Sequence, residues 1–297
     1  MKDLFVSIVI PNYNGEELLL ENIPHVLSAF GDSGNRIIEV IVVDDCSTDK
    51  SIEVLKNNFP DVKLVKHKTN RRFSAACNTG ARMAKGELIC LLNTDVKPAK
   101  NFLHRVIPHF KDNLLFAVSL NEKGYSWASG NFCKGFVEHE GGKKSSHAHH
   151  TFWVNGGSGV FVRDVWMKLK GMDEELYPPF YWEDIDLSYR AAKRGYKLLW
   201  EPHAMVLHEH ESTNKVFKTS YRQRIQERNQ LLFIWRNITS SRMFRKHIKG
   251  LLNRIVLHPG YLRIVFMAIL KFAGVHRLRK IEKKESVVSD ESIFARF

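Results

Sequence analysis

The first hundred residues alternate between strand-like and helix-like segments. Short apolar runs rich in β-branched residues occupy 5–11, 37–45, 62–67 and 88–92, and segments with helical spacing occupy 16–30, 49–57 and 74–84. This alternation predicts an α/β domain whose sheet is mostly parallel and carries helices on both faces. Ligands of such sheets bind beyond the carboxyl ends of the strands. Thr48 or Asp49 is expected to cap the second helix.

Three of these strands end in polar residues, which should therefore meet at one edge of the sheet. The clusters are Pro11-Asn12-Tyr13-Asn14, Asp44-Asp45 and Asn93-Thr94-Asp95. Asp95 follows the buried run "LICLL", where desolvating a carboxylate is costly unless it is paired or binds a cation. A turn or a helix cap is the alternative role for this aspartate.

The end of the first strand argues against two enzyme classes that use α/β sheets. A dinucleotide-binding oxidoreductase places a glycine-rich turn there, whereas "PNYNGEE" has a single glycine. A nucleotidyltransferase would be expected to carry a glycine-rich, basic phosphate loop, which this stretch also lacks.

The composition is that of a globular protein. With 297 residues, 44% of them hydrophobic, the chain suffices for one large domain and an appendage. Cys46, Cys77, Cys90 and Cys133 show no metal-ligand spacing, and reduced thiols are a simpler interpretation than two disulfides. No signal peptide and no run of roughly 20 apolar residues is present. We therefore expect a cytoplasmic chain that does not cross a bilayer.

Residues 121–152 show little periodicity, and "EHEGGKKSSHAHH" is typical of a mobile loop. His147, His149 and His150 are conceivable metal ligands within it, although a solvated loop is the simpler interpretation. The following "VNGGSGVFVR" is a glycine-rich approach to a short strand, and a helix is expected at 164–169.

A second acidic cluster stands in "YPPFYWEDIDLSYRAAKRGYKLLW". Asp184 lies at the start of a predicted helix, where the helix dipole favours an ionised carboxylate. Asp186 and Arg190 are four residues apart and can pair on that helix. Capping explains part of this cluster, but three acids behind Tyr181-Trp182 exceed what a cap needs, and aromatic residues beside acids suit a polyhydroxylated ligand.

Alternation in "EPHAMVLHEHEST" predicts a strand that delivers His208 or His210 to the edge of a site. The imidazole of one of these histidines and the carboxylate of Asp95 would form a candidate Mn²⁺ or Mg²⁺ site. The phosphates of the substrate would complete it. A structural role is the alternative for a single histidine there.

Taken together, six segments resemble glycosyltransferase family 2, the inverting nucleotide-sugar transferases of GT-A fold, and most of all its rhamnosyl- and galactofuranosyltransferase-like branch. In order, they are "VSIVIPNYNG", "VIVVDDCSTD", "NRRFSAACNTGARMAKGELICLLNTD", "GGSGVFVR", "GMDEELYPPFYWEDIDLSYRAAKRGYKLLW" and "AMVLHEHEST". The resemblance covers about residues 5–212.

The resemblance implies a role for each matching residue. Asp184 would be the catalytic base, and Asp95 and His208 the metal ligands. The nucleotide-sugar set would be Pro11, Tyr13, Asn14, Asp45, Arg71, Asn78, Asn93 and Thr94, with Asp45 on the base. Candidates on the acceptor side are Gly157, Ser158, Trp182 and Glu183. Asn93-Thr94-Asp95 replaces the family's Asp-X-Asp motif and keeps only its last carboxylate.

Two departures from the family pattern bear on substrate contacts. Arg72 stands where the family usually has glycine, which could alter donor contacts, and Ser158 lies near a position often filled by alanine, which affects acceptor preference. The expected reaction is a single displacement with inversion, because one positioned carboxylate can deprotonate the acceptor hydroxyl. A retaining mechanism would ask for a second nucleophile, and the sequence gives no independent reason to assign Glu183 that role.

The net charge of +13 is concentrated after the resemblance ends. Residues 215–284 carry eighteen Lys and Arg side chains and two acidic ones, a local charge of +16, whereas residues 1–214 balance at −1. Two apolar stretches here flank Pro259-Gly260, and in the first a helical face is shared by Phe244, Ile248, Leu251, Leu252 and Ile255.

The second stretch, 261–274, is too short to span a bilayer and suits a helix in a membrane interface. Packing on the catalytic domain or on a second subunit is an alternative, as is nucleic-acid binding, for which no motif is present.

We therefore expect a GT-A catalytic domain at 1–214, with its nucleotide-sugar half at about 1–98 and its acceptor half at about 99–214, and a basic amphipathic helical tail at 215–297. The expected partners are a nucleotide-diphosphate sugar and a glycan or lipid-linked acceptor of cell-surface polysaccharide synthesis. An anionic surface on the inner face of the membrane is a further expected partner, whereas nucleic acid is not. The chain could also form a homo-oligomer. The rival hypothesis is a non-catalytic nucleotide-sugar binding protein that keeps the fold.

Overall fold

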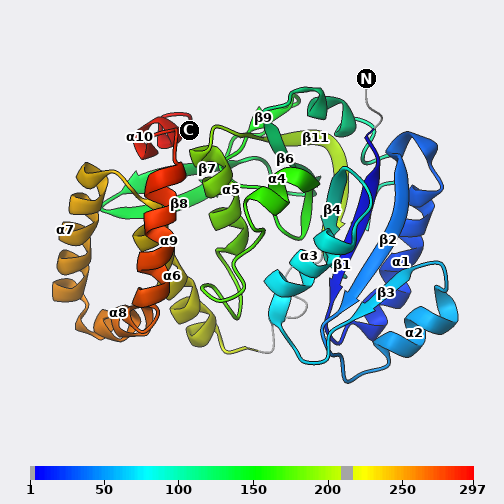
Figure 1. Cartoon of the computed structure of the whole chain (residues 1–297), viewed down its shortest axis with the longest axis horizontal. Helices are drawn as coiled ribbons and strands as arrows, with labels where there is room; N and C mark the ends of the chain where they lie inside the picture. The colour runs from blue at the N-terminus through cyan, green and yellow to red at the C-terminus, as the bar shows by residue number, and fades with distance from the viewer. Residues whose placement is uncertain (1–3, 209–216) are drawn as a thin grey trace.

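The first half of the central sheet is parallel. The computed structural model describes residues 4–208 and 217–297 (Figure 1). Strands β1 (Val6–Asn12), β2 (Ile37–Asp44), β3 (Lys63–Lys66) and β4 (Leu88–Leu92) pair in parallel in the order β3-β2-β1-β4. All four strands predicted from apolar runs are confirmed.

The second half of the sheet is mixed. Strand β10 (Ser158–Val162) runs antiparallel to both β4 and β6 (Leu115–Glu122). Strand β11 (Lys197–His208) pairs in parallel with β6 and antiparallel with β5 (Val96–Pro98) and β9 (His149–His150). The pairing of β10 with β4 therefore joins the two halves of the expected α/β fold.

Helices cover both faces of the sheet, as predicted. Alternate residues of β1 point to opposite faces. Ile8 packs with α1 (Glu16–Phe30) and α2 (Ser51–Asn58). Val9 packs with α3 (Arg72–Met83), α4 (Arg163–Lys168) and α5 (Glu183–Lys193). Short 3-10 turns lie at Ser33–Asn35 and Ile107–Lys111.

Asp49, one of the two expected caps, hydrogen-bonds the start of α2 from one position before the N-cap. The N-cap residue is Lys50, whose side chain makes no capping hydrogen bond. Asp49 accepts from Ser51 N over 3.0 Å and also from Glu16 N, the first residue of α1, over 2.9 Å. Its carboxylate therefore joins the starts of two helices.

The expectation of a loop over 121–152 is partly wrong. Strands β7 (Ala128–Cys133) and β8 (Phe136–Gly141) form an antiparallel hairpin. Phe136 and Val137 are buried in a second hydrophobic core with Phe152. The hairpin escapes sequence reasoning because its side chains gain partners from distant segments: His139 packs on Trp182, and Phe136 packs on His247, which belongs to the helices that follow residue 217.

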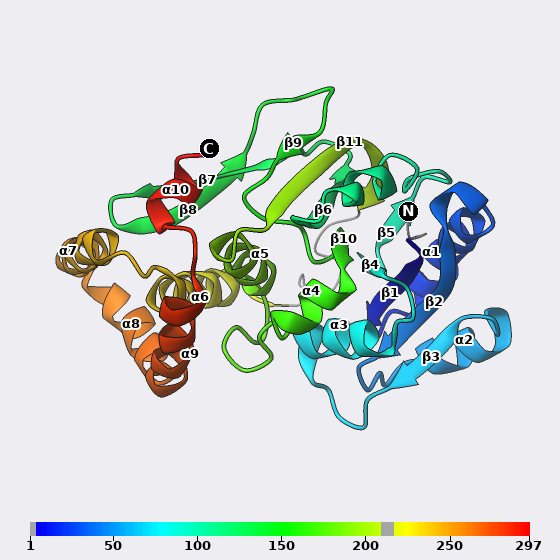
Figure 2. The same cartoon turned by 45° about the horizontal axis from the view of Figure 1, so that its top comes forward.

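These helices are α6 (Thr219–Asn237), α7 (Ser241–Leu257), α8 (Leu262–Ile269), α9 (Phe272–Glu285) and α10 (Asp290–Phe294), with a 3-10 turn at Pro259–Tyr261. They lie at the end of the molecule opposite β2 and β3 (Figures 1 and 2). The second core contains residues of α6 to α10, the hairpin and α5. The proposed boundary at residue 214 lies outside the described residues.

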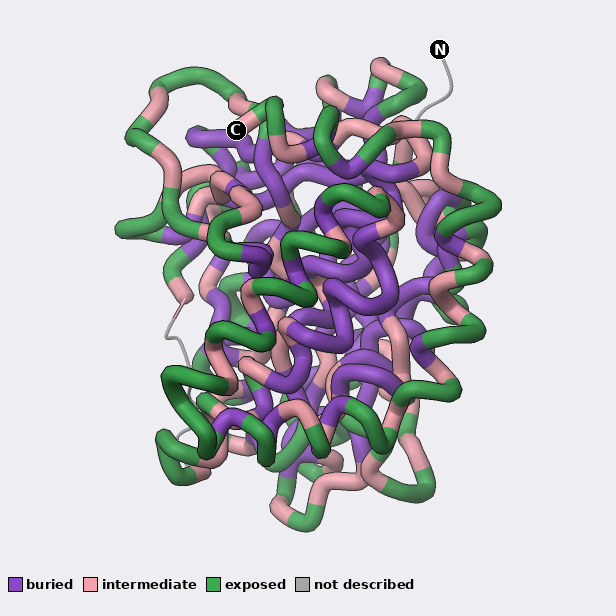
Figure 3. The backbone as a smooth tube through the Cα atoms, turned by 90° about the vertical axis from the view of Figure 1, so that its left-hand side faces the viewer, coloured by how far each residue is buried: buried purple, intermediate pink, exposed green. Residues whose placement is uncertain are grey.

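Only part of the predicted apolar face of α7 is buried. Leu251 is buried in the second core, whereas Ile248 and Leu252 are 42% and 60% exposed. Figure 3 shows the molecule from the side on which the helices after residue 217 lie, and buried and exposed segments alternate along the backbone there. Helix α7 thus packs with one side and presents apolar residues on another.

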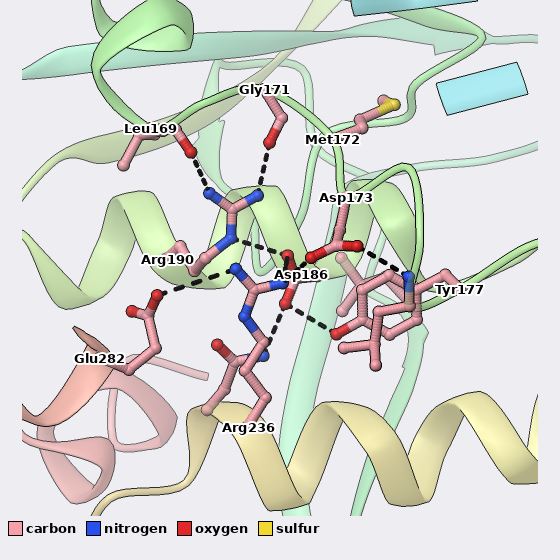
Figure 4. A network of polar contacts seen from close by, with 12 residues as sticks. Leu169, Gly171, Met172, Asp173, Tyr177, Asp186, Arg190, Arg236 and Glu282 are labelled. Carbon is pink, nitrogen blue, oxygen red and sulfur yellow. Dashed lines mark hydrogen bonds and ion pairs between the residues drawn. The ribbon is translucent and has the colours of Figure 1, made fainter. Parts of the chain in front are cut away.

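A buried charge network fastens α6 and α9 to α5 (Figure 4). The Asp186 carboxylate accepts from Arg190 Nε over 2.7 Å, as the spacing in α5 predicts, and from Arg236 Nη1 over 3.1 Å. Arg236 of α6 also contacts Asp173 at 2.9 Å and Glu282 at 3.9 Å. The two guanidinium groups outweigh the effect of burial and keep the pKa of Asp186 below its usual value.

Substituting Asp186→Ala should lower the free energy of unfolding by about 3–5 kcal/mol, because Arg190 and Arg236 would stay buried without their shared carboxylate. Urea denaturation measures this change. Asp112→Ala is the matched control: its ion pair with Lys197 has the same 2.7 Å length, but both side chains are well exposed. Equal effects of the two substitutions would contradict the assigned importance of the network.

Candidate active site

Polar side chains of three strand ends meet at one edge of the sheet, as predicted. Asn12 lies opposite Asp44 in the pairing of β1 with β2, and its Nδ2 donates to Asp44 Oδ1 over 2.9 Å. On the other side of β1, strand β4 leads into Asn93-Thr94-Asp95, where Thr94 O accepts from Asn22 of α1 over 2.7 Å. Gly15 lies between these ends, since an added Cβ there would overlap the Asn12 amide and contact Thr94.

Asp45, directly after β2, is buried beneath the segment 67–72. Its Oδ1 lies 2.7 Å from His67 Nδ1 and accepts from Arg71 N over 2.8 Å, and its Oδ2 accepts from Arg72 N over 2.6 Å. Arg72 has a φ of 75°, a left-handed conformation that glycine adopts more readily. The Asp45 carboxylate thus holds the backbone of Arg72 in a conformation that favours glycine.

Pro11 and Asn14 contact β2 and the turn that follows it. Pro11 pairs with Val43 in the sheet, and Asn14 Oδ1 accepts from Thr48 N over 2.7 Å. The Tyr13 side chain is 40% exposed. The Tyr13 ring is therefore accessible to a ligand at this edge of the sheet.

Arg71 and Asn78 are turned toward the segment 172–174. Arg71 Nη2 lies 2.7 Å from Glu174 Oε2. Asn78 Nδ2 donates to Met172 O over 2.8 Å and to Glu174 Oε1 over 2.9 Å, while its Oδ1 accepts from Met172 N and Trp166 Nε1. Both ends of the Asn78 amide are thus engaged by the protein, which suits packing better than donor binding.

Asp95, His208 and Glu122 converge from three neighbouring strands. Asp95 precedes β5, in which Val96 pairs with His208, and Glu122 ends β6 opposite Val206. His208 Nε2 lies 3.1 Å from Asp95 Oδ1, and His208 Nδ1 lies 2.9 Å from Glu122 Oε1. Burial opposes protonation of His208, but the bonds to these two carboxylates outweigh it and raise the pKa of His208 to about 9. His210, the alternative ligand, lies outside the described residues.

The Asp95 and His208 atoms fit two ligands of a divalent cation. Neighbouring ligands of an octahedral ion at about 2.1 Å lie about 3 Å apart, close to the 3.1 Å between Asp95 Oδ1 and His208 Nε2. Carboxylate and neutral imidazole are both ligands of Mn²⁺, so a bound ion would have to displace the Nε2 proton that the two carboxylates favour on His208. Among residues 4–208 and 217–297, no group of three or more His, Cys, Asp or Glu side chains is arranged to hold a metal ion. Such an ion would therefore need further ligands from a substrate.

Asp184 and Glu183 begin helix α5 after two residues with positive φ, Tyr181 at 71° and Trp182 at 77°. Asp184 Oδ2 accepts from Gly156 N over 3.2 Å, and its Oδ1 accepts from Ile185 N over 2.8 Å. Burial raises the pKa of Asp184 to about 6. Burial and the neighbouring Asp184 charge raise the pKa of Glu183 to about 8. Trp182 is only 4% exposed and packs on Phe233, its ring centroid 5.1 Å away.

The loop 155–158, which leads into β10, connects these groups. Gly156 N donates to Asp184, and Gly157 O accepts from Asn93 N over 2.8 Å. A Cβ at Gly157 would overlap the Asn93 amide, so any larger residue there would force the Asn93 side chain to move. At the other end of the loop, Ser158 Oγ donates to Glu122. The structure thus brings Asn93, Asp95, Gly157, Ser158, Asp184 and His208 to one region and adds Glu122.

Sequence reasoning missed Glu122 because residues 121–152 were interpreted as a loop. A usable signal exists: the apolar run "LLFAVSL" ends in Asn121-Glu122 much as "LICLL" ends in Asn93-Thr94-Asp95. The same pattern of a buried strand that ends on a carboxylate therefore occurs twice.

Comparison with known proteins identifies the family. The model of "Glycosyl transferase family 2" matches residues 7–158. An uncharacterized glycosyltransferase of Haemophilus influenzae is 39% identical over 114 residues, 37% of this chain and 44% of that protein. The amylovoran biosynthesis glycosyltransferase AmsB of Erwinia amylovora is 28% identical over 220 residues, 67% of each chain. The matches to the first three curated relatives span less than half of each relative's length.

Solved structures show the same fold. GalNAc-T7 with UDP, GalNAc and Mn²⁺ superposes with a TM-score of 0.61 at 18% identity, over 80% of this chain and 48% of that one. Mannosyltransferase PcManGT from Pyrobaculum calidifontis, in complex with GDP-Man and Mn²⁺, has a TM-score of 0.59 at 17% identity, over 95% and 85%. The mixed α/β sheet with its flanking helices is thus a GT-A fold, as expected, and the chain belongs to glycosyl transferase family 2.

Proposed function

We propose that the chain transfers a sugar from a nucleotide-diphosphate sugar to a hydroxyl of a glycan or lipid-linked acceptor, with inversion at the anomeric carbon. One observation carries the proposal: the loop 155–158 joins the Asp184 carboxylate to Asn93, two residues from Asp95. A candidate base and a candidate diphosphate site are therefore held by the same backbone. Solved proteins of this fold that bind UDP, GDP-Man or UDP-GlcNAc support the donor class.

Asp184 is the proposed base. It takes the proton of the acceptor hydroxyl while that oxygen bonds to the anomeric carbon and the bond to the diphosphate breaks. Burial and the neighbouring Asp184 charge raise the pKa of Glu183, which disfavours the ionised form that a nucleophile needs and therefore favours single displacement. Its raised pKa gives the sequence-based preference for inversion a physical reason.

At the other end of the site, Asp95 and His208 would hold a Mn²⁺ or Mg²⁺ ion. The bound ion would supply Lewis-acid stabilisation of the charge that grows on the leaving diphosphate. Tyr13 would bind the nucleoside, and Asp45 would shape that site by holding the segment 67–72. Direct donor contacts are not assigned to Asp45 or Asn78, because the protein engages the polar atoms of both side chains. The match to AmsB supports a place in polysaccharide biosynthesis. We also propose that the chain is a hexosyl- or deoxyhexosyltransferase with a rhamnosyl- or galactofuranosyl-like specificity.

Substituting Asp184→Asn should reduce transfer about 10²–10⁴-fold, because the amide takes no proton. Its single oxygen can accept from Gly156 N or from Ile185 N, but not from both. Release of nucleoside diphosphate from UDP- and GDP-sugars, with glycan or water as acceptor, measures the rate. Thermal stabilisation by UDP or GDP with Mn²⁺ should persist. Asp164→Asn, at the exposed start of α4, is the control. Full activity of Asp184→Asn would overturn the proposed base, and no turnover by the wild-type chain despite nucleotide binding would favour a non-catalytic binding protein.

The transfer rate should fall as the pH falls through about 6, because Asp184 acts only while ionised and burial raises its pKa to about that value. Initial rates at saturating donor between pH 5 and 8 measure this dependence, with folding followed by tryptophan fluorescence at each pH. A rate that stays constant down to pH 5 would contradict the assignment.

We further propose that the helices after residue 217 bind an anionic membrane surface on its inner face. In the described residues, no helix is long and apolar enough to cross a bilayer. A surface of α7 and α8 carries exposed apolar side chains: Ile248, Leu252, Val256, Leu257, Leu262, Phe266, Ile269 and Leu270. Exposed basic residues on the same two helices are Arg242, Arg245, Lys246, Lys249 and Arg263. Apolar insertion and roughly 1 kcal/mol per basic residue would favour acidic lipid.

Replacing Leu252 and Phe266 together by Glu should abolish co-sedimentation with phosphatidylglycerol vesicles, because each change puts a charge into the apolar surface. Deleting the helices would be a poor test, since Leu251 and Ile264 belong to the second core. Leu114→Glu, at a residue 52% exposed outside these helices, is the control. Unchanged sedimentation would refute the membrane role, and a dimer that the double variant dissociates would assign the surface to a second copy.

A further inference from the structure

Glu122 is a buried carboxylate, 6% exposed, at the end of β6. Its Oε1 lies 2.9 Å from His208 Nδ1 and accepts from Asn155 Nδ2 over 2.8 Å and from Ser158 Oγ. Three groups from two separate segments, β11 and the loop 155–158, thus meet at one carboxylate oxygen. None of the six segments that carry the family resemblance includes this residue.

The contact with His208 determines which ring nitrogen faces the candidate metal position. When Nδ1 donates to Glu122, Nε2 is left to face Asp95 Oδ1, 3.1 Å away. A carboxylate behind a metal-bound histidine fixes the ring orientation and makes the ligating nitrogen more basic. The pairing of Val206 with Glu122 holds the two strands in the register that this contact requires.

The contacts with Asn155 and Ser158 extend this effect to the catalytic side. These residues flank Gly156, which donates to Asp184, and Gly157, which accepts from Asn93 N. A displacement of the Glu122 carboxylate would therefore move the histidine ligand and the backbone that holds the proposed base.

We propose that Glu122 is a positioning residue that orients His208 toward a divalent cation and fixes the loop 155–158 against Asp184. The inference rests on the proposed function, in which Asp95 and His208 are the metal ligands. In this role Glu122 would act through His208 and the loop 155–158 rather than as a ligand of the cation.

Substituting Glu122→Gln tests this role. The dissociation constant for Mn²⁺, obtained from the EPR signal of free Mn²⁺ titrated with the full-length protein, should rise about 10–100-fold, as for other partners of metal-bound histidines. Glu201→Gln is a matched control, because Glu201 is a buried glutamate on β11 that contacts His109 at 2.6 Å, away from Asp95. This control should leave the Mn²⁺ affinity unchanged.

Thermal melting of each variant separates loss of affinity from loss of the fold. If Glu122→Gln does not fold, Glu122→Asp keeps the charge but draws the carboxylate back by one methylene, and a rise in its dissociation constant is the expected result. A folded Glu122 variant with wild-type Mn²⁺ affinity would overturn the inference and leave Glu122 a structural hydrogen-bond acceptor. Wild-type affinity in both Asp95→Ala and His208→Ala would instead overturn the proposed metal site itself, and the role of Glu122 with it.

Discussion

The antiparallel pairing of β10 with β4 is the constraint on which the site depends. Because Ser158 lies opposite Leu92, the loop 155–158 must run past the end of β4. Gly157 then lies so close to Asn93 that a side chain at Gly157 would displace the Asn93 amide, and Gly156 N reaches Asp184. A shift of one residue would exchange the two faces of β10 and break these contacts. One strand register thus aligns the proposed donor and acceptor sides.

The second constraint is the buried charge of Asp186, which lies outside the candidate active site. Asp186 is fully buried, and such a charge is tolerated only when hydrogen-bonded partners replace its lost hydration. Arg190 supplies one partner from α5 itself and Arg236 supplies another from α6, while Arg190 also donates to Leu169 O and Gly171 O. The start of α5, with Asp184, is therefore fixed by contacts one turn further along the helix.

The sequence was sufficient where structure is local. Apolar runs located β1 to β4 closely, and the four-residue spacing of Asp186 and Arg190 identified their pairing. It was insufficient where a residue's role depends on a distant segment. Asn78 looks available in sequence, yet Met172 and Trp166 occupy its amide. Glu122 gains its partners from 33 to 86 residues away, and no local pattern reports such distances.

The helices after residue 217 are basic, as charge counting indicates, but charge alone does not make them a separate appendage. Tyr181 and Trp182 hold positive φ values just before Glu183, a conformation that non-glycine residues adopt only when their surroundings enforce it. Part of that enforcement comes from α6, where Asn229 Nδ2 donates to Phe180 O and Tyr181 O over 2.9 Å and Arg228 Nη2 donates to Pro178 O. The same helix leads directly into α7 and its exposed apolar residues. A membrane or partner that binds α7 would therefore contact a helix that continues into α6, and α6 holds the turn before Asp184.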